Sequence, residues 1–409
     1  MVVHSVVAQG ELLDRHVDSL FRQGVYFEVG LLIGRSAEGN RSHLYVLVPT
    51  PSNEDGGGKE GGEGNGGSSG PGVGVAGGGK GRHDGKQAAA SLPILDSDWI
   101  GEHARQVCRL LPGGIQVLGV YVFGTEPVFK SLAAALNSTL YAVCQAILSE
   151  CNDSFSNTKV PDDMLLLHVC SSPKKYSCKS CPSGSGTTPL VGMKPCEMKF
   201  GNVLGSLRCC SNRYKVDIRM PLISEKLGRR YSLRSAIDAA ISKESVRLHY
   251  AISAVDDGLL VDDALVGTLF DTKADGGAPY GRVEVLFLLP PIGSVHTETS
   301  DSCESTDSTL GPENSVKEDE VIGMIAIRGT VQGVAYAHVR EPVRRLIADL
   351  KGDVIRSLRT RLDVLYDEIE REQTEENEVS GPVETSTSGE NPEARKPRHA
   401  LLLSADENG

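Results

Sequence analysis

Runs of apolar residues change their period along the chain, and each change marks an expected element. The runs GVYFEVGLLIGRS and HLYVLVPTP, within the first 52 residues, predict two strands of a hairpin. A 3.6-residue period then predicts a helix that has Asp98 as its N-cap and ends at the PGG of residues 112–114. The buried strand IQVLGVYVFG is expected to follow directly.

A second helix is expected from about residue 126 to residue 150, because apolar residues recur there every three or four positions. They are Phe129, Leu132, Leu136, Leu140, Val143 and Ile147. The run DMLLLHVCS predicts another buried strand after this helix. This order favours a mixed sheet covered by helices, and therefore an α+β fold.

Strands also dominate the second half of the chain, in the runs RYKVDIRMPL, GRVEVLFLLPP and VIGMIAIRGTVQGVAYAH. A long helix is expected over about residues 341–371, with Pro342 in its first turn. One continuous apolar stripe follows the helix: Val343, Ile347, Leu350, Val354, Leu358, Leu362, Leu365 and Ile369. The stripe could pack on its own domain or dock another protein.

Composition divides the chain into segments. Glycine and charged residues fill positions 53–90, which cannot bury enough surface to offset chain entropy, so a disordered insertion is expected there. The expected segments are a sheet domain over 1–170 that holds this insertion, a Cys/Ser/Pro-rich loop region over 171–211, a strand-rich domain over 212–371 with a mobile loop at 292–319, and a disordered tail over 372–409.

Charge and composition exclude several functions. The net charge of -12 over 409 residues argues against nucleic acid as a partner, because phosphate binding needs a basic surface. A GxGxxG match at residues 72–77 lacks the strand and helix that a nucleotide site requires, so no cofactor is expected. No signal peptide is visible and no apolar run approaches the roughly 20 residues of a bilayer span, so the thiols are expected to be reduced.

The cysteines suggest one weak metal site. The pair Cys178 and Cys181 has zinc-ligand spacing, and Cys196 with Cys209 could complete four soft ligands. Unpaired thiols in a loop explain the same pattern better, so no metal is expected.

The other candidate side chains have structural explanations. His103 and His168 lie in apolar stretches, which favours buried, hydrogen-bonded core histidines. The acidic pairs at 256–257 and 262–263 flank a GLLV run, where turn residues are expected rather than an acid–base pair or a calcium site.

Several stretches together carry a family resemblance. The motifs YFEVGLLIGR, YVLVPTP, DWIGEHARQVCRLLPGGIQVLGVYV and VIGMIAIRGTVQGVAYAHVREPVRRLIADLKGDVIRSLRTRLDVLYDEI resemble the odorant-response-abnormal protein four family. The resemblance covers roughly residues 1–50 and 91–371, and the DWIGEHARQV stretch is its most specific part.

The resemblance implies an adaptor at the cytosolic face of the endoplasmic reticulum. Such proteins assist the localisation of membrane receptors, and they recruit the cysteine protease of the ubiquitin-fold-modifier system. Family members usually carry a C-terminal membrane anchor. This sequence shows none before Gly409, so the expected contact with the membrane is by association.

The first half is also similar to the MPN fold of the JAMM deubiquitinases, whose zinc is held by an H-x-H pair and an Asp. In VLGVYVFG the two histidine positions are Val122 and Gly124, and the Ser and Asp positions fall near Leu132 and Ala135. Only Glu28 matches the early glutamate of such a site. Because a hydrolytic zinc normally needs three protein ligands, the resemblance implies a catalytically dead site.

A non-catalytic adaptor is therefore expected, with docking surfaces at the edges of the 116–124 strand region and on the 341–371 helix. Pairing with another MPN domain would make it part of a hetero-oligomer. Two alternatives stay open. One is a zinc-dependent hydrolase with a non-standard site built around Glu28, Cys178 and Cys181; the other is a soluble trafficking chaperone unconnected to the modifier system.

Overall fold

The structure, a computed structural model, describes residues 4–37, 41–53, 95–151, 163–182, 193–223, 233–256, 258–271, 282–290 and 321–379, together with Pro93 and Pro161. It divides into two compact units. The first runs to Arg208 and includes Tyr336–Val339; the second contains Cys209–Ala335 and the chain from Arg340. The expected insertion at 53–90 (apart from Asn53), the loop at 292–319 and the tail beyond Val379 lie outside the described residues.

An eight-stranded mixed sheet forms the centre of the first unit. Its strand order is β7-β6-β5-β4-β2-β3-β1-β8. The strands are β1 (Ser5–Gln9), β2 (Glu28–Ala37), β3 (Arg41–Pro49), β4 (Gln116–Gly124), β5 (Asp163–Ser171), β6 (Lys174–Pro182), β7 (Lys194–Pro195) and β8 (Glu197–Gly201). The helices are α1 (Gly10–Gln23), α2 (Ser97–Leu110), α3 (Glu126–Ser131) and α4 (Ala133–Cys151), with a 3-10 turn at Leu204–Ser206.

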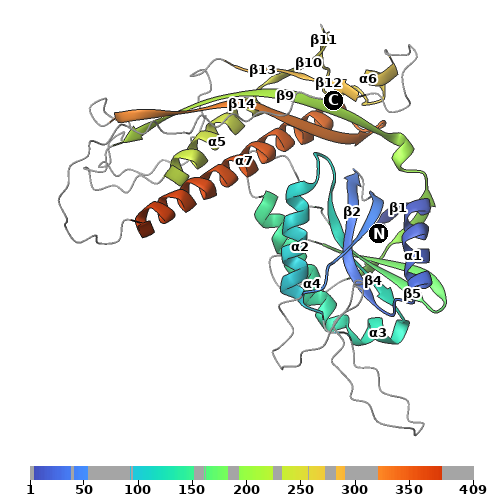
Figure 1. Ribbon diagram of the computed structural model, residues 1–409. Coiled ribbons are helices and arrows are strands. Elements are labelled where there is room, and N and C mark those ends of the chain that lie inside the picture. Colours follow the sequence, from blue (N-terminus) through green and yellow to red (C-terminus); the bar gives the residue numbers. More distant parts are fainter. Residues whose placement is uncertain are drawn as a thin grey trace, which may run out of the picture. The chain divides into compact units, whose positions relative to one another are not determined.

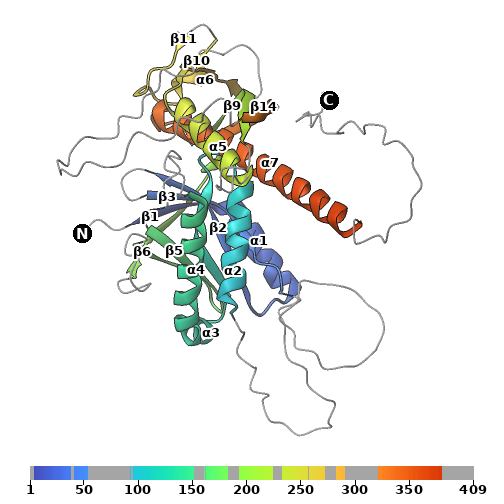
Figure 2. The same ribbon diagram turned by 90° about the vertical axis from the view of Figure 1, so that its left-hand side faces the viewer.

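Helices cover both faces of this sheet, with α1 on one side and α2 and α4 on the other (Figure 1). Figure 2 shows α2 and α4 side by side. The central strands β4 and β5 are consequently apolar on both faces, as a sheet between two helical layers requires. Two apolar cores result. One joins α1 to residues such as Leu118 and Phe123, and the other joins α2 and α4 to residues such as Val120 and Val122.

The two edges of the sheet meet at residues 194–201. β7 pairs with β6, while β8 pairs in parallel with β1. Between them, the amide of Cys196 donates to the carbonyl of Cys178, and the amide of Glu197 donates to the carbonyl of His4. Residues 194–201 therefore join the two edge strands of the sheet, on the face that α1 covers.

The α+β prediction is confirmed, and the differences are local. The helix predicted over 126–150 is two helices, because Leu132 interrupts it between α3 and α4. The N-cap of α2 is Asp96, whose side chain accepts from the amide of Trp99, and not Asp98. Helix α1 was not predicted, although Leu13, Val17 and Leu20 recur on one buried face.

The loop region predicted over 171–211 is wrong over its described residues, whereas residues 183–192 lie outside them. That stretch contains β6, β7, β8 and the start of β9. Because cysteine and serine fill these strands, their sequence does not show a recognisable apolar alternation. Cys178 and Cys181 are nevertheless buried like other core residues of a sheet. The first unit accordingly extends to Arg208 and not to residue 170.

The second unit is built on two long strands, β9 (Leu207–Ile223) and β14 (Val321–His338), which form a three-stranded sheet with β12 (Arg282–Glu284). A second sheet has the order β11-β10-β13. Its strands are β10 (Ile252–Val255), β11 (Gly258–Leu259) and β13 (Leu286–Leu288). The helices are α5 (Leu233–His249), α6 (Thr268–Asp271) and α7 (Val343–Val379).

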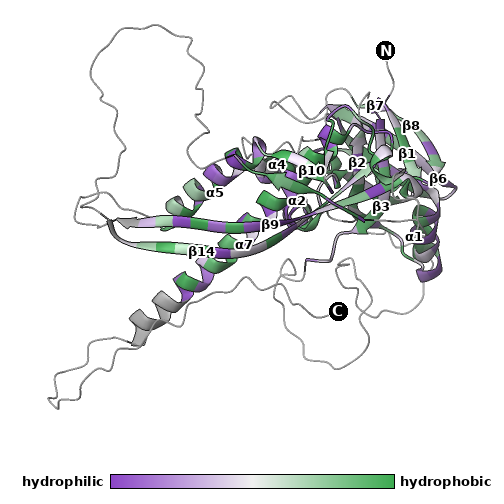
Figure 3. Cartoon of the chain, turned by 90° about the horizontal axis from the view of Figure 1, so that it is seen from above, coloured by the Kyte–Doolittle hydropathy of each residue, from purple (hydrophilic) through white to green (hydrophobic). Residues whose placement is uncertain are grey.

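The apolar stripe of α7 packs on its own unit. Val354, Leu358 and Leu362 are buried in one core with residues of β9, β14 and α5. Figure 3 shows the alternation of hydrophobic and hydrophilic residues along α7. The helix continues to Val379, so the tail predicted from residue 372 is wrong over its first eight positions, which remain helical.

Candidate functional site

The end of β4 carries the two positions that were compared with metal-ligating histidines. Val122 is fully buried against α2 and α4, and an added Cβ at Gly124 would meet Phe27 of the same core. Glu28 pairs with Phe123, which is the residue after Val122 on β4. Since successive residues of a strand face opposite sides, Glu28 lies on the α1 face of the sheet. The structure does not bring Glu28 together with Val122 and Gly124.

Glu28 instead belongs to a hydrogen-bonded cluster under α1. The Tyr121 hydroxyl donates to Glu28 Oε1 at 2.7 Å, and His16 Nε2 of α1 lies 2.8 Å from the same oxygen. His16 Nε2 is also 3.2 Å from the Tyr121 hydroxyl. Burial, and then the neighbouring Glu28 carboxylate, raises the pKa of Tyr121 well above its ordinary value. The cluster ties α1 to β2 and β4.

Replacing Tyr121 with phenylalanine is expected to destabilise the chain by about 1.5–3 kcal/mol, because a donor to a charged acceptor is lost from a buried place. The free energy of unfolding in urea measures the effect. Tyr366→Phe is the matched control, since that hydroxyl forms a solvent-exposed hydrogen bond to Glu370 Oε1 at 2.8 Å on α7. Equal shifts of the two urea midpoints would contradict a structural role for the Glu28 cluster.

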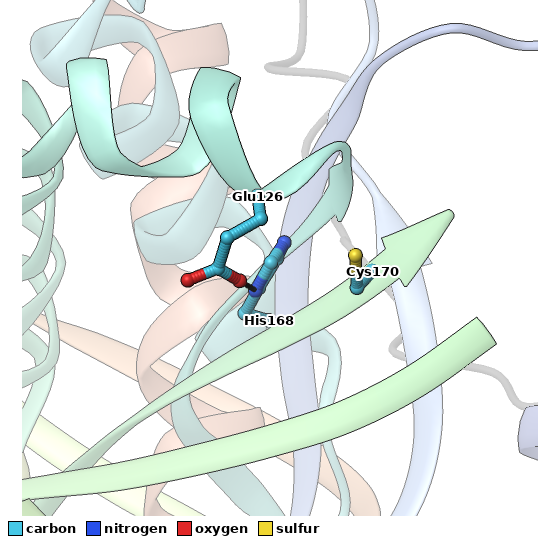
Figure 4. Close-up of side chains that lie close together, drawn as sticks. All are labelled: Glu126, His168 and Cys170. Carbon is cyan, nitrogen blue, oxygen red and sulfur yellow. Dashed lines mark ion pairs between the residues drawn. The ribbon is translucent and has the colours of Figure 1, made fainter. Parts of the chain in front are cut away.

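A second polar cluster lies where β4 and β5 end (Figure 4). It consists of Glu126, which opens α3, and of His168 and Cys170 on β5. One potential ligand atom from each side chain lies within 4.8 Å of the other two. In the part of the chain that the structure describes, this is the one group of three or more such side chains.

The imidazole of His168 is held on three sides. Its Nε2 is 3.2 Å from the carbonyl oxygen of Gly124, its Nδ1 is 3.5 Å from Glu126 Oε2, and its ring stacks on Phe129 at 4.1 Å between centroids. Burial lowers the pKa of His168; the Gly124 carbonyl and Glu126 oppose this, while Lys179 adds to it. The prediction of a buried, hydrogen-bonded histidine is confirmed.

The sequence held a signal for this cluster that was overlooked. In LLLHVC, His168 and Cys170 stand two residues apart on a strand, so their side chains face the same side. β4 and β5 are parallel, and Val122 pairs with His168. Their carboxyl ends therefore meet at one edge, and the first residue of the helix after β4, Glu126, reaches that edge.

The four cysteines of the weak zinc candidate are not brought together. Cys178 pairs with Leu167 on the α1 face of β6, whereas Cys181 pairs with Met164 on the opposite face. The Cys178 thiol donates to the Cys196 sulfur, which raises the pKa of Cys178 and lowers that of Cys196. Cys209 belongs to the second unit. Because its two thiols point to opposite faces, the CxxC pair cannot hold one ion between them.

A serine, a histidine and an aspartate also meet in the order of a hydrolase triad. His4 Nε2 lies 3.0 Å from Ser42 Oγ, and His4 Nδ1 lies 3.2 Å from Asp163 Oδ2. Ser42 is only 2% exposed, however, and His4 only 6%. Both side chains are therefore shielded from a substrate, and the trio joins the residue before β1 to β3 and β5.

The remaining candidates are structural. His103 Nδ1 lies 3.1 Å from Thr50 Oγ1, and partial burial lowers the pKa of His103. Asp256 has a left-handed φ of 50°, which suits a turn as predicted. Asp263 is paired with Arg344 at the start of α7.

Comparison with known proteins identifies the family. The family model described as odorant response abnormal 4-like matches residues 30–401, which is most of the chain. The chain belongs to this odorant response abnormal 4-like family.

Animal relatives of this odorant response abnormal 4-like chain match over most of its length. The mouse protein odr-4 homolog is 23% identical over 368 residues, which cover 88% of this chain and 70% of the mouse protein. The Xenopus laevis protein odr-4 homolog is 26% identical over 364 residues, covering 87% and 70%. The Caenorhabditis elegans odorant response abnormal protein 4 is 26% identical over 80 residues, or 20% of this chain and 17% of that protein.

The described helices were also compared with the length and apolarity of a bilayer span. Among them, none combines the two properties. The long α7 fails because charged residues recur along it.

Proposed function

We propose that this chain is a non-catalytic adaptor at the cytosolic face of the endoplasmic reticulum. It assists the localisation of membrane receptors and recruits the cysteine protease of the ubiquitin-fold-modifier system. The observation that carries the proposal is membership of the odorant response abnormal 4-like family over residues 30–401.

The chemistry at the end of β4 supports an adaptor that does not hydrolyse its partners. The positions compared with histidine ligands hold Val122 and Gly124, which offer no side-chain donor atom. The comparable glutamate, Glu28, bonds Tyr121 and His16 on the other face of the sheet. A hydrolase built around Glu28, Cys178 and Cys181 is disfavoured as well, because those two thiols face opposite sides of β6.

Neither docking surface expected from the sequence suits this role. β4 is central, with one edge paired to β2 and the other to β5, so it offers no free edge. The apolar stripe of α7 is buried in its own unit. An adaptor therefore needs a different surface.

The outer face of the β11-β10-β13 sheet supplies one. Ile252 pairs with Leu288, and Ala254 pairs with both Leu286 and Leu259, so these side chains share a face. The four large ones are between 50% and 65% exposed. We refer to Ile252, Leu259, Leu286 and Leu288 as the apolar sheet face. Contiguous exposed apolar side chains of this kind mark interaction sites.

The modifier protease is the partner that we assign to the apolar sheet face. The double substitution Ile252→Asp with Leu288→Asp is expected to weaken its binding at least about tenfold, since a charge would be buried at the interface. Titration calorimetry with the purified protease and the full chain measures the affinity.

Leu110→Asp is the matched control, because Leu110 is an apolar side chain outside the apolar sheet face, 83% exposed, on α2. It should leave the affinity unchanged. Protease binding that both variants retain would remove the apolar sheet face from the proposal. The complete absence of binding by the unaltered chain would favour the alternative of a trafficking chaperone unconnected to the modifier system.

A further inference from the structure

We propose that Glu126, His168 and Cys170 bind one zinc ion at the carboxyl ends of β4 and β5. This site differs from the positions compared with the JAMM ligands, since it uses neither Val122 nor Gly124 as a ligand. It also differs from the cysteine set suggested by the CxxC spacing. The proposal is independent of the adaptor function, and its test does not depend on that function.

The spacing of the side chains fits one tetrahedral ion. Zinc lies about 2.0–2.3 Å from nitrogen, oxygen and sulfur ligands, which places two ligands of one tetrahedral ion about 3.3–3.7 Å apart. The distance between His168 Nδ1 and Glu126 Oε2 is 3.5 Å. That separation is too long for a strong hydrogen bond and falls within the range for two ligands of one metal. One ring nitrogen of His168, one carboxylate oxygen of Glu126 and the Cys170 sulfur all lie within 4.8 Å of one another, so a movement of about 1 Å or more would bring the thiol to the separation of two zinc ligands.

The surroundings of His168 prepare its Nδ1 as a ligand. The Gly124 carbonyl oxygen can only accept a hydrogen bond, so Nε2, 3.2 Å away, carries the proton. In the neutral ring the lone pair is then on Nδ1, which faces Glu126. Zinc-binding histidines are usually held in this way by a carbonyl or carboxylate on the other nitrogen. Phe129, stacked on the imidazole at 4.1 Å, fixes the plane of the ring.

The ligand types select the ion. A cysteine thiolate and an imidazole are poor ligands for magnesium or calcium and good ligands for zinc. Deprotonated Cys170 and Glu126 together contribute two negative charges, which match the divalent ion. Two lysines place opposing charge nearby: Lys130 Nζ lies 3.3 Å from Glu126 Oε1, and Lys179 Nζ lies 5.9 Å from the centre of the Phe129 ring. Three protein ligands leave the fourth position to water, and the ion would tie α3 to β5.

Zinc content of the purified full chain tests the site. After reconstitution with zinc and removal of free metal, we expect about one zinc per chain. Glu126→Gln should lower the zinc affinity at least about 100-fold, because even losing an outer-shell partner costs 10–100-fold. The Glu126 side chain is 51% exposed, so this variant is expected to fold normally. His168→Gln and Cys170→Ser should have similar effects, with circular dichroism as the check on folding.

Cobalt substitution and a control cysteine complete the test. The cobalt form should show a thiolate-to-cobalt absorption band, and Cys170→Ser should abolish it. Cys181 lies on the same face of the neighbouring strand β6, and Cys181→Ser should retain both the absorption band and the zinc affinity. A chain that binds no zinc would overturn the proposal. A zinc ion whose affinity is unchanged in Glu126→Gln and Cys170→Ser would overturn it equally.

Discussion

Replacing Gly119 with valine is expected to prevent the first unit from folding. Gly119 lies in the middle of β4 with φ at 154°, which side chains rarely adopt. A Cβ there would stand 1.9 Å from the carbonyl oxygen of Leu165 in the paired strand β5. Because the obstacle is backbone, β4 and β5 would have to separate. The expected cost exceeds about 4 kcal/mol, a large share of the stability of an ordinary domain.

Urea unfolding and near-ultraviolet circular dichroism measure this effect. Gly201→Val is the matched control, since the nearest atom to a Cβ at Gly201 in β8 is a Val7 methyl carbon at 4.0 Å. The control should fold with little change in its urea midpoint. A native-like Gly119→Val protein with the same midpoint would show that β4 and β5 are not paired in the described register.

Substitution of Arg35 with alanine should have the second-largest effect, about 3 kcal/mol or more. Arg35 is 2% exposed, and its Nη1 donates to the carbonyl of Gly114 at 2.8 Å and to that of Tyr336 at 2.9 Å. These bonds hold the β2 end, the turn before β4 and the last residues of β14 together within the first unit. Alanine would leave two carbonyl groups without this donor and a cavity where the side chain had been.

Arg15→Ala is the control for the loss of an arginine. Arg15 forms an exposed pair with Glu11 on α1, of a kind that contributes little to stability. The urea midpoints of the two variants should therefore differ clearly. Hydrogen exchange should also show faster exchange of the Tyr336 amide, which donates to Gly113, in Arg35→Ala only. Equal midpoints would contradict the structural role of Arg35.

Local periodicity was sufficient to predict most of the elements. The stripe from Leu136 to Ile147 predicted α4, and the apolar run around Val120 predicted β4, because burial imposes those periods directly. β6 was missed because burial there involves cysteine and serine, whose pattern is not recognisably apolar. The pairing of β8 with β1 joins residues nearly 200 positions apart, which no local pattern encodes.

Prediction of the candidate site had the same limit. The sequence could place Glu28 on a strand, but its partners His16 and Tyr121 depend on α1 folding over the sheet. Likewise, the H-x-C spacing of His168 and Cys170 is local, whereas the approach of Glu126 follows from the parallel pairing of β4 with β5. Side chains from one strand were therefore predictable together, and those from different elements were not.

Affinity purification of the tagged full chain from cells tests the adaptor function most directly. We expect the ubiquitin-fold-modifier protease and membrane receptor clients to be retained with the chain, and the Ile252→Asp, Leu288→Asp variant to lose the protease. Retention of neither the protease nor any receptor by the unaltered chain would contradict the adaptor function.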